Sequence, residues 1–261
     1  MLTLYSWNVN GLRAAARKGF LDWLQATRPD ILAVQETKCH PDQLTPDLRR
    51  PEGYHTYWAW AERKGYSGLG LYTRQEPLSV EMGLGFPEYD REGRTIVAEY
   101  PDFVLLAAYF PNGGRDLSRV PFKMAYKRDF LAACNRWRTR GKEVIFCGDV
   151  NTAHREMDLA RPRQNQQHTG FLPEERAWID QVLAEGYIDS YRALHPEESG
   201  AYTWWSYIGG ARSRNVGWRL DYFFVAPGLW SRVAAAGIHA NVFGSDHCPV
   251  SLSLEPRLPT G

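Results

Sequence analysis

The chain has 261 residues, of which 44% are hydrophobic and 23% charged, and its formal net charge is +1. This length suffices for a substantial core within one domain, and the composition argues against a largely disordered chain. A net charge so close to zero argues against a protein that coats nucleic acid without specificity. The same net charge is compatible with a local basic face on an otherwise neutral protein.

Short runs rich in β-branched and aromatic residues, bounded by glycine or proline, predict the strands. In chain order they span 2–9, 31–35, 54–60, 68–72, 95–100, 104–109, 144–147, 221–225 and 249–254. Amphipathic patterns predict helices around 20–24 and 122–134, and a third that begins near Pro173. Strands occur both in succession and separated by helices, which favours an α/β fold of two packed mixed β-sheets flanked by helices. We expect one domain spanning residues 1–261.

The sequence lacks the features of an exported or membrane protein. No basic region with a following apolar run opens the chain, and no stretch reaches bilayer length. The cysteines are scattered and form no CxxC pair: Cys39, Cys134, Cys147 and Cys248. We therefore expect a cytoplasmic protein with buried free thiols, without a membrane partner or a zinc or disulfide framework. Nothing in the sequence demands a partner subunit, so a monomer is expected.

Polar clusters follow the predicted strands at six places: WNVN, QETK, YFPN, GDVN, RLDY and GSDH. Because residues two apart on a strand face the same way, Asn8 with Asn10, and Asp149 with Asn151, could each present two oxygen ligands to one site. Taken singly, such clusters are ordinary turns, and a lone histidine is usually a hydrogen-bonded imidazole. Their recurrence, with Glu, His and Tyr among them, favours a shared site instead.

The residue types of these clusters suit phosphodiester hydrolysis. Glu36, Asp246 and the Asn10 amide are hard oxygen ligands of the kind that Mg²⁺ prefers. Asp149 is a candidate to orient or deprotonate the attacking water, with Asn151 holding that water in line.

Two further residues could stabilise charge on the phosphate. His247, if paired with Asp221, would be biased towards its protonated form and could donate to a phosphate oxygen. Tyr109 would supply a neutral donor to the same oxygens.

In order along the chain, WNVNGLRA, QETK, YFPNGG, GDVNTAHREMDL, GWRLDYF and GSDHCP resemble the exonuclease III family of abasic-site endonucleases, within the endonuclease/exonuclease/phosphatase superfamily. The resemblance implies a four-layered α/β sandwich and a Mg²⁺-dependent DNA-repair phosphodiesterase, with Mn²⁺ as a substitute ion. Such an enzyme cleaves the DNA backbone 5′ to abasic sites in base excision repair. It also processes 3′ ends as a 3′→5′ exonuclease, 3′-phosphatase or phosphodiesterase, so its partner is double-stranded DNA with abasic sites or blocked 3′ ends.

The resemblance also implies roles for individual residues. The metal side comprises Asn8, Asn10, Glu36, Asp149, Asn151 and Asp246. The catalytic residues are Tyr109, Asp149, Asn151, Asp221 and His247. Substrate contacts come from Asn112, Arg115, His168, Trp204, Trp218 and Leu220. Whether Asp149 or the His247–Asp221 pair activates water stays open, as does the number of metal ions.

The substrate side is aromatic and basic. By the resemblance, Trp204, Trp218 and Leu220 wall a pocket for a flipped-out abasic sugar, although single strand aromatics belong more often to the core. The flanking arginines are candidates for holding the phosphate backbone: Arg212, Arg214 and Arg219. Arg115 would insert into or grip the duplex; its ordinary alternative is a solvated arginine.

Two positions depart from the family pattern. His168 stands where relatives carry an asparagine or a small residue, and its imidazole could hinder strand entry and favour nicked or 3′-blocked ends. Asn10 replaces an aspartate of some relatives, which removes one ligand charge. The balance between endonuclease and 3′-end activities is therefore open.

Two other classes of protein share parts of this pattern. A superfamily phosphatase acting on inositol phosphates or sphingomyelin would keep the catalytic residues but lack the Trp204 and Trp218 arm and the basic loop residues. A catalytically dead nucleic-acid-binding module has no need for Glu36, Asp149 and His247 together.

Overall fold

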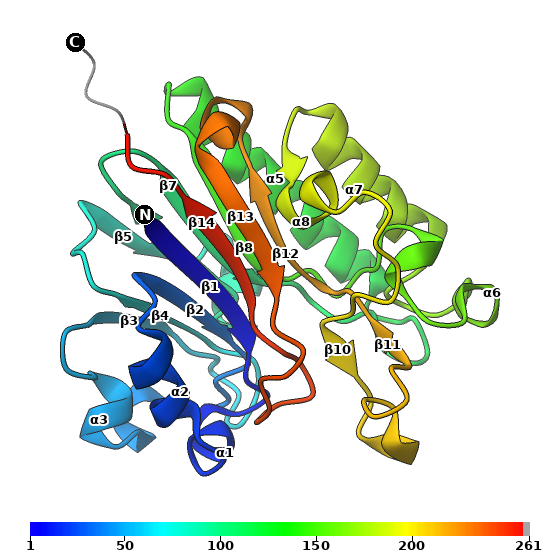
Figure 1. Ribbon diagram of the computed structural model, residues 1–261, viewed down its shortest axis with the longest axis horizontal. Coiled ribbons are helices and arrows are strands. Elements are labelled where there is room, and N and C mark those ends of the chain that lie inside the picture. The colour runs from blue at the N-terminus through cyan, green and yellow to red at the C-terminus, as the bar shows by residue number, and fades with distance from the viewer. Residues whose placement is uncertain (258–261) are drawn as a thin grey trace.

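The computed structural model describes residues 1–257, in which two six-stranded sheets pack face to face with helices on their outer faces (Figure 1). In spatial order the first sheet contains β13 (Val233–Ile238), β14 (Val250–Leu254), β1 (Leu2–Asn8), β2 (Ile31–Gln35), β4 (Leu69–Thr73) and β3 (His55–Ala59). The second contains β5 (Ser79–Met82), β6 (Thr95–Glu99), β7 (Val104–Tyr109), β8 (Val144–Asp149), β12 (Asp221–Val225) and β9 (Ile188–Asp189). A separate two-stranded arm pairs β10 (Trp204–Trp205) with β11 (Gly217–Trp218).

The helices form the outer layers and the connections. They are α1 (Leu12–Ala16), α2 (Phe20–Thr27), α3 (Pro46–Arg49), α4 (Pro87–Asp90), α5 (Val120–Thr139), α6 (Pro162–Asn165), α7 (Pro173–Ala184) and α8 (Ser190–Leu194). Short 3₁₀ turns occupy Pro41–Gln43, Glu156–Asp158, Ile208–Gly210 and Pro227–Arg232. Among residues 1–257, no helix combines the length and the apolar character needed to cross a bilayer.

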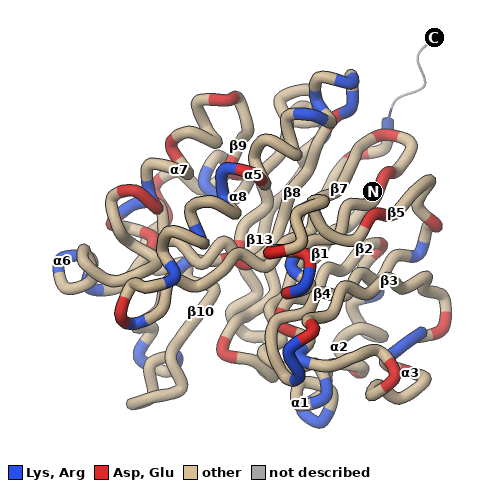
Figure 2. The backbone as a smooth tube through the Cα atoms, turned by 180° about the vertical axis from the view of Figure 1, so that it is seen from behind, with Lys and Arg blue, Asp and Glu red and all other residues tan. Residues whose placement is uncertain are grey.

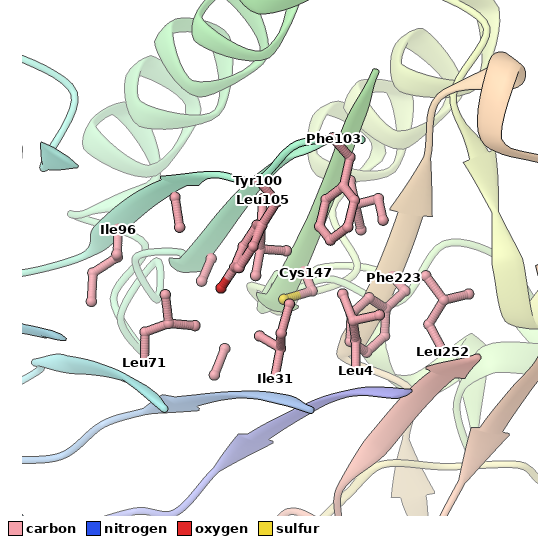
Figure 3. Close-up of a cluster of buried hydrophobic side chains, with 14 of the residues drawn as sticks. Leu4, Ile31, Leu71, Ile96, Tyr100, Phe103, Leu105, Cys147, Phe223 and Leu252 are labelled. Carbon is pink, nitrogen blue, oxygen red and sulfur yellow. The ribbon is translucent and has the colours of Figure 1, made fainter. Parts of the chain in front are cut away.

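The principal core lies between the two sheets. Leu4 and Ile31 from the first sheet meet Leu105 and Phe223 from the second (Figure 3). A second apolar layer joins the other face of the second sheet to α5 and α7, and a third joins the first sheet to α1 and α2. The expected four-layered α/β sandwich is therefore confirmed.

The predicted strands are confirmed to within two residues at their ends, and the three predicted helices are α2, α5 and α7. The prediction missed β5, β9, β13 and the short arm strands. The sequence of β13 is VAAAGI, which is poor in β-branched residues, and β5 is a largely exposed edge strand. All four cysteines are free and buried, as expected.

The topology brings distant polar residues to one edge of the sandwich. Strands β1 and β2 pair in parallel, as do β7 and β8. The last residues of β1 and β8, Asn8 and Asp149, are hydrogen-bonded, so the carboxyl ends of all four strands lie at the same edge. Gly148 precedes the last residue of β8 with φ of 138°, and a Cβ atom there would lie 1.8 Å from the carbonyl oxygen of Ala108. Only glycine therefore fits directly before Asp149.

A buried ionic network supports this edge from behind. Arg219 is 0% exposed, and its guanidinium contacts Asp158 at 2.8 Å and Asp189 at 2.8 Å. Asp158 also accepts from Arg192 at 2.6 Å. The prediction that Arg219 holds a phosphate backbone is therefore wrong, because its donors are already paired inside the protein.

We expect Asp158→Asn to lower the free energy of unfolding by about 3 kcal/mol at pH 7, because it leaves Arg219 and Arg192 without a buried countercharge. Urea unfolding measures this loss. Burial opposes ionisation of Asp158, but Arg219 outweighs it and holds the pKa of the carboxyl well below its usual value. The stabilisation is therefore present above about pH 4 and shrinks as the pH falls further.

The matched control is Asp180→Asn, whose carboxylate is 70% exposed beside His154. Because exposed ion pairs contribute little, this variant should lose less than about 1 kcal/mol. Equal losses for the two variants would contradict the assignment of Asp158 as a buried ionic centre.

Candidate active site

A cleft of about 570 Å³ opens at the edge where the strand ends converge. Most of the predicted site residues line it: Glu36, Tyr109, Asn112, Arg115, Asp149, Asn151, His168, Trp204, Trp218, Leu220, Asp246 and His247. Asn8 and Asp221 lie buried behind this lining, and Asn10 lies beside Asp246. The structure thus brings the whole predicted set together, while the role of each residue remains a prediction.

Several residues at this edge adopt a backbone conformation that side chains usually avoid. Asn10, Glu36, Lys38 and Asn151 have φ values of 45°, 53°, 52° and 52°. Such left-handed residues each cost conformational energy and persist where the surroundings demand them. Here they turn the chain sharply after β1, β2 and β8, which directs the polar side chains into the cleft.

Asn8, the last residue of β1, joins the two sheets. Its side-chain amide donates to Glu36 at 2.9 Å and to Asp149 at 2.9 Å. Its amide oxygen accepts from the backbone N–H of Asn10 at 3.0 Å, which uses the oxygen that we expected to face a metal. Asn8 therefore fixes the spacing of two carboxylates.

Lys38 links the residues on the first-sheet side of the cleft. Its ammonium lies 2.8 Å from the Glu36 carboxylate and also donates to the side-chain oxygen of Asn10. Asn10 in turn donates to Asp246 at 2.9 Å. Burial opposes ionisation of Glu36, but Lys38 and the Asn8 amide hold the pKa of Glu36 below its usual value. Glu36 is therefore a carboxylate at neutral pH.

The predicted pairing of His247 with Asp221 is present. Nδ1 of His247 lies 2.8 Å from the Asp221 carboxylate, which also accepts from the hydroxyl of Thr203 at 2.6 Å. Burial alone would lower the pKa of His247, but Asp221 and Asp149 outweigh it and raise the pKa to about 10. His247 is therefore a buried cation whose Nε2 lies 3.8 Å from Asp149.

Asp149 is the most perturbed carboxyl in the cleft. Burial, reinforced by Asp221 and Glu36, raises its pKa to about 7 although His247 opposes the shift. Its oxygens accept from the backbone N–H of Asn151 at 2.8 Å and from the Asn8 amide. A carboxyl with a pKa near neutrality is suited to taking or returning a proton.

Tyr109 is held by Arg94, the residue before β6. The guanidinium donates to the backbone oxygen of Tyr109 at 3.0 Å, and its centre lies 4.8 Å from the centre of the tyrosine ring. Burial and the Glu36 carboxylate raise the pKa of Tyr109 well above its usual value. The phenol is therefore neutral at physiological pH and is available as a donor.

The donor set fits a hard divalent cation. Ligand atoms of Asp149, Asp221 and His247 lie within 4.8 Å of one another, a spacing that alone would suit a metal ion. Asp221 is occupied by His247 and Thr203, however, and a protonated imidazole has no lone pair for a metal. Glu36 and Asp246 at the cleft surface are better candidates, because Mg²⁺ prefers oxygen ligands and binds through few carboxylates.

The outer wall of the cleft is aromatic. Trp204, Trp218 and Leu220 pack in one cluster, with the two tryptophan ring centres 6.5 Å apart. The Trp204 indole donates to Asp246 at 3.1 Å, which fastens the β10–β11 arm to the loop that carries Asp246 and His247. His168 is an exposed residue of the same cleft lining.

Lysine and arginine positions lie along the backbone near α1 and near α6 (Figure 2). We call this exposed set the basic rim: Arg13, Arg17, Lys18, Arg161 and Arg163. Arg214 is exposed and lines the cleft, as expected of a phosphate contact. Arg212 instead donates to the backbone oxygens of Ser245 at 3.0 Å and Ala240 at 2.9 Å, so its predicted phosphate role is wrong.

Sequence reasoning missed two contributors to this site. Lys38 belongs to the QETK segment and was assigned no role, yet it contacts both Glu36 and Asn10. Thr203 precedes the paired tryptophans and orients Asp221. Their proximity to the strand-end motifs was the available signal, but their contacts depend on the folded chain.

The sequence matches the Endonuclease/Exonuclease/phosphatase family over residues 5–247. It is 46% identical to the DNA repair nuclease APEX1 of Danio rerio over 97% of this chain and 82% of that protein. It is 45% identical to an exodeoxyribonuclease of Bacillus subtilis over 96% of this chain and 98% of that protein. The fold is similar to that of an AP endonuclease from Archaeoglobus fulgidus, with a TM-score of 0.88, 27% identity, and coverage of 98% of this chain and 100% of the other.

The contacts of Lys38 generate a prediction about metal affinity. Glu36→Gln should weaken Mn²⁺ binding roughly tenfold, because it removes a ligand charge, whereas Lys38→Met should strengthen it by a similar factor, because it removes a competing cation. Calorimetric titration of each purified variant with Mn²⁺ measures both effects. Changes in the same direction for the two variants would show that Lys38 does not compete for Glu36.

Proposed function

Because the chain belongs to the Endonuclease/Exonuclease/phosphatase family, we propose that it is a Mg²⁺-dependent DNA-repair phosphodiesterase that cleaves the backbone 5′ to abasic sites. It also processes 3′ ends as a 3′→5′ exonuclease, 3′-phosphatase or phosphodiesterase. The observation that carries this proposal is the arrangement of Glu36, Asp149 and His247 below a wall of two tryptophans. The similarity to a DNA repair nuclease and an exodeoxyribonuclease supports the same activity.

Mg²⁺ would be held by Glu36 and Asp246, with amide oxygens of Asn10 and Asn151 nearby, and Mn²⁺ would substitute for it. When bound, the ion neutralises phosphate charge and offsets charge on the leaving oxygen. Nearby charges favour such a cation. The acidic side chains Glu36, Asp149, Asp221 and Asp246 outnumber the two cationic side chains near them, Lys38 and His247.

The chain's own residues would then act on the phosphate and on water. Asp149 orients the attacking water and accepts its proton, while Asn151, hydrogen-bonded to Asn112 at 3.1 Å, holds the geometry in line. His247, kept cationic by Asp221, donates from Nε2 to a phosphate oxygen. Tyr109 donates to the same group.

The substrate would be double-stranded DNA with an abasic site or a blocked 3′ end. The apolar wall of Trp204, Trp218 and Leu220 suits a bare deoxyribose better than a sugar that carries a base. Arg115 and Arg161 line the cleft, and with the rest of the basic rim they would contact the phosphate backbone of the duplex. A phosphatase for inositol phosphates would not need the β10–β11 arm, and this observation favours DNA.

We further propose that residues 1–261 act as one catalytic domain and as a monomer in the cytoplasm. The family match from 5 to 247 and the pairing of β1 with β14 support a single unit. The four free thiols favour a reducing compartment.

A single assay tests the proposed activity. The protein is incubated with a duplex carrying one tetrahydrofuran abasic analogue, with Mg²⁺ or with EDTA, and the products are separated on a denaturing gel. Mg²⁺-dependent cleavage 5′ to the analogue is expected. Absence of cleavage, with phosphate released from inositol phosphates instead, would assign the chain to the phosphatases.

Asp149→Asn and His247→Ala should each slow single-turnover cleavage by about 10³-fold, because each removes a group that acts on a proton or on charge in the transition state. Duplex binding, measured by fluorescence anisotropy in EDTA, should change by less than about threefold, since the basic rim is intact. His55→Ala on the edge strand β3 is the control and should cleave normally. Near-normal cleavage by either cleft variant would remove its assigned role.

His168→Asn should raise abasic-site incision relative to 3′-end removal by about tenfold, because a smaller side chain opens the lining next to the tryptophan wall. Both activities are measured on matched duplexes, one with an internal abasic analogue and one with a 3′-phosphate at a nick. An unchanged ratio would mean that His168 does not select between the substrates.

A further inference from the structure

A buried ion pair lies beneath the floor of the cleft, outside the set of residues assigned to catalysis. Lys123 on α5 contacts Glu175 at the start of α7 at 2.6 Å, and both side chains are 0% exposed. A buried ion pair is a poor source of stability, because desolvating two charges offsets most of their attraction. The other contacts of this pair indicate what it does.

Lys123 fixes the loop that follows β8, which contains Asn151. Its ammonium donates to the backbone oxygen of Asn151 at 2.5 Å. Asn151 has the left-handed φ of 52°, and its backbone N–H and side chain contact Asp149. The lysine therefore secures a strained peptide next to the proposed proton acceptor.

Glu175 holds a second loop, residues 168–172, which carries His168. Its carboxylate accepts from the backbone N–H groups of Gly170 at 2.5 Å and Leu172 at 3.0 Å, and from the hydroxyl of Thr169 at 2.9 Å. The same loop packs on the tryptophan wall, since a Cβ atom on Gly170 would lie 3.2 Å from the Trp218 ring.

Thr169 extends the network to a third loop. Its hydroxyl oxygen accepts from the backbone N–H of Gly113 at 3.0 Å. Gly113 lies between Asn112 and Arg115, the two residues of that loop expected to contact substrate. A Cβ atom on Gly113 would lie 2.2 Å from this hydroxyl, so the two loops are in close contact.

We propose that Lys123 and Glu175 are positioning residues that fix the three substrate-facing loops, 112–115, 151–153 and 168–172, in register with one another before DNA binds. This inference rests on the proposed function for the meaning of the loops. Lys123 acts on the chemical step through Asn151, whereas Thr169, held by Glu175, acts on substrate binding through Gly113 and the neighbouring His168. Substitution of Lys123 and substitution of Thr169 are therefore expected to have different kinetic effects.

The chain offers a matched control one helical turn along α5. Lys127 is also fully buried, but its ammonium contacts the Thr152 hydroxyl at 2.7 Å and the backbone oxygen of Glu175 at 3.3 Å. It contacts the 151–153 loop only through the Thr152 side chain, and it makes no hydrogen bond to the Asn151 backbone or to the 168–172 loop. Lys127→Met therefore removes a comparable buried lysine side chain without releasing the Asn151 peptide.

We expect Lys123→Met to lower kcat on the abasic duplex by about 10- to 100-fold with KM within about twofold, since small displacements of a catalytic group have effects of this size. Thr169→Val should raise KM about fivefold with kcat nearly unchanged, because it removes the hydroxyl that links Gly113 to Glu175. Lys127→Met should change both constants by less than about threefold. Rates are normalised to the folded fraction measured by circular dichroism.

A double variant separates positioning from charge balance. In Lys123→Met/Glu175→Gln no unpaired charge is buried, so stability should recover relative to Lys123→Met, while kcat stays low because the Asn151 oxygen still lacks its donor. Recovery of kcat in the double variant would overturn the proposal. Equal kcat losses for Lys123→Met and Lys127→Met, or an unchanged KM for Thr169→Val, would also overturn it.

Amide hydrogen exchange keeps this test separate from that of the proposed function. Lys123→Met should speed exchange of segments containing Asn151 and Gly170 by at least about tenfold, and Lys127→Met should not. Unchanged exchange would overturn the positioning role even in an active enzyme. Suppose that Lys123→Met exchanges faster while the wild-type protein does not cleave the abasic duplex. That result would support the loop network and reject the DNA-repair activity instead.

Discussion

The side-chain amide of Asn8 is the contact on which the geometry of the cleft depends. It stands at the end of β1 in the first sheet and donates to Glu36, which follows β2, and to Asp149, which ends β8 in the second sheet. Packed sheets are separated by about 10 Å of side chains, so their ends do not meet unless something spans the gap. One short amide does so here, and Glu36 on the proposed metal side is thereby held next to Asp149, the proposed proton acceptor.

The charges around that amide explain why the carboxyl groups of the cleft differ in pKa. Burial disfavours every ionised carboxyl, yet Glu36 and Asp246 stay ionised because Lys38, His247 and amide donors face them. Asp149 has the least compensation, so its pKa lies near neutrality. Excluding solvent from a cluster of carboxylates strengthens both their attraction for a cation and their repulsion of one another.

The sequence predicted most of the strands and the location of the site, for identifiable physical reasons. Runs of Val, Ile, Tyr and Phe mark buried strands, and Glu36 or His247 directly after such a run is not explained by turn chemistry. Buried polar partners could not be predicted. Arg219 in a Trp-Arg-Leu-Asp segment and Lys123 on an amphipathic helix resemble solvated side chains, and only the folded chain brings Asp158 and Glu175 to them. The missed strand β13 is rich in alanine and glycine and acquires its conformation by pairing with β14.

The pairing of β1 with β14 has a consequence for when the enzyme becomes active during its synthesis. The register joins Leu2 to Leu254, and the Trp7 indole donates to the backbone oxygen of His247 at 3.2 Å, so the chain as far as Leu254 must leave the ribosome before the first sheet closes. A nascent chain already carrying Asp149 still lacks its cationic histidine. The proposed hydrolytic site is therefore completed only after His247 and β14 have been synthesised, and the slow formation of such distant contacts delays it further.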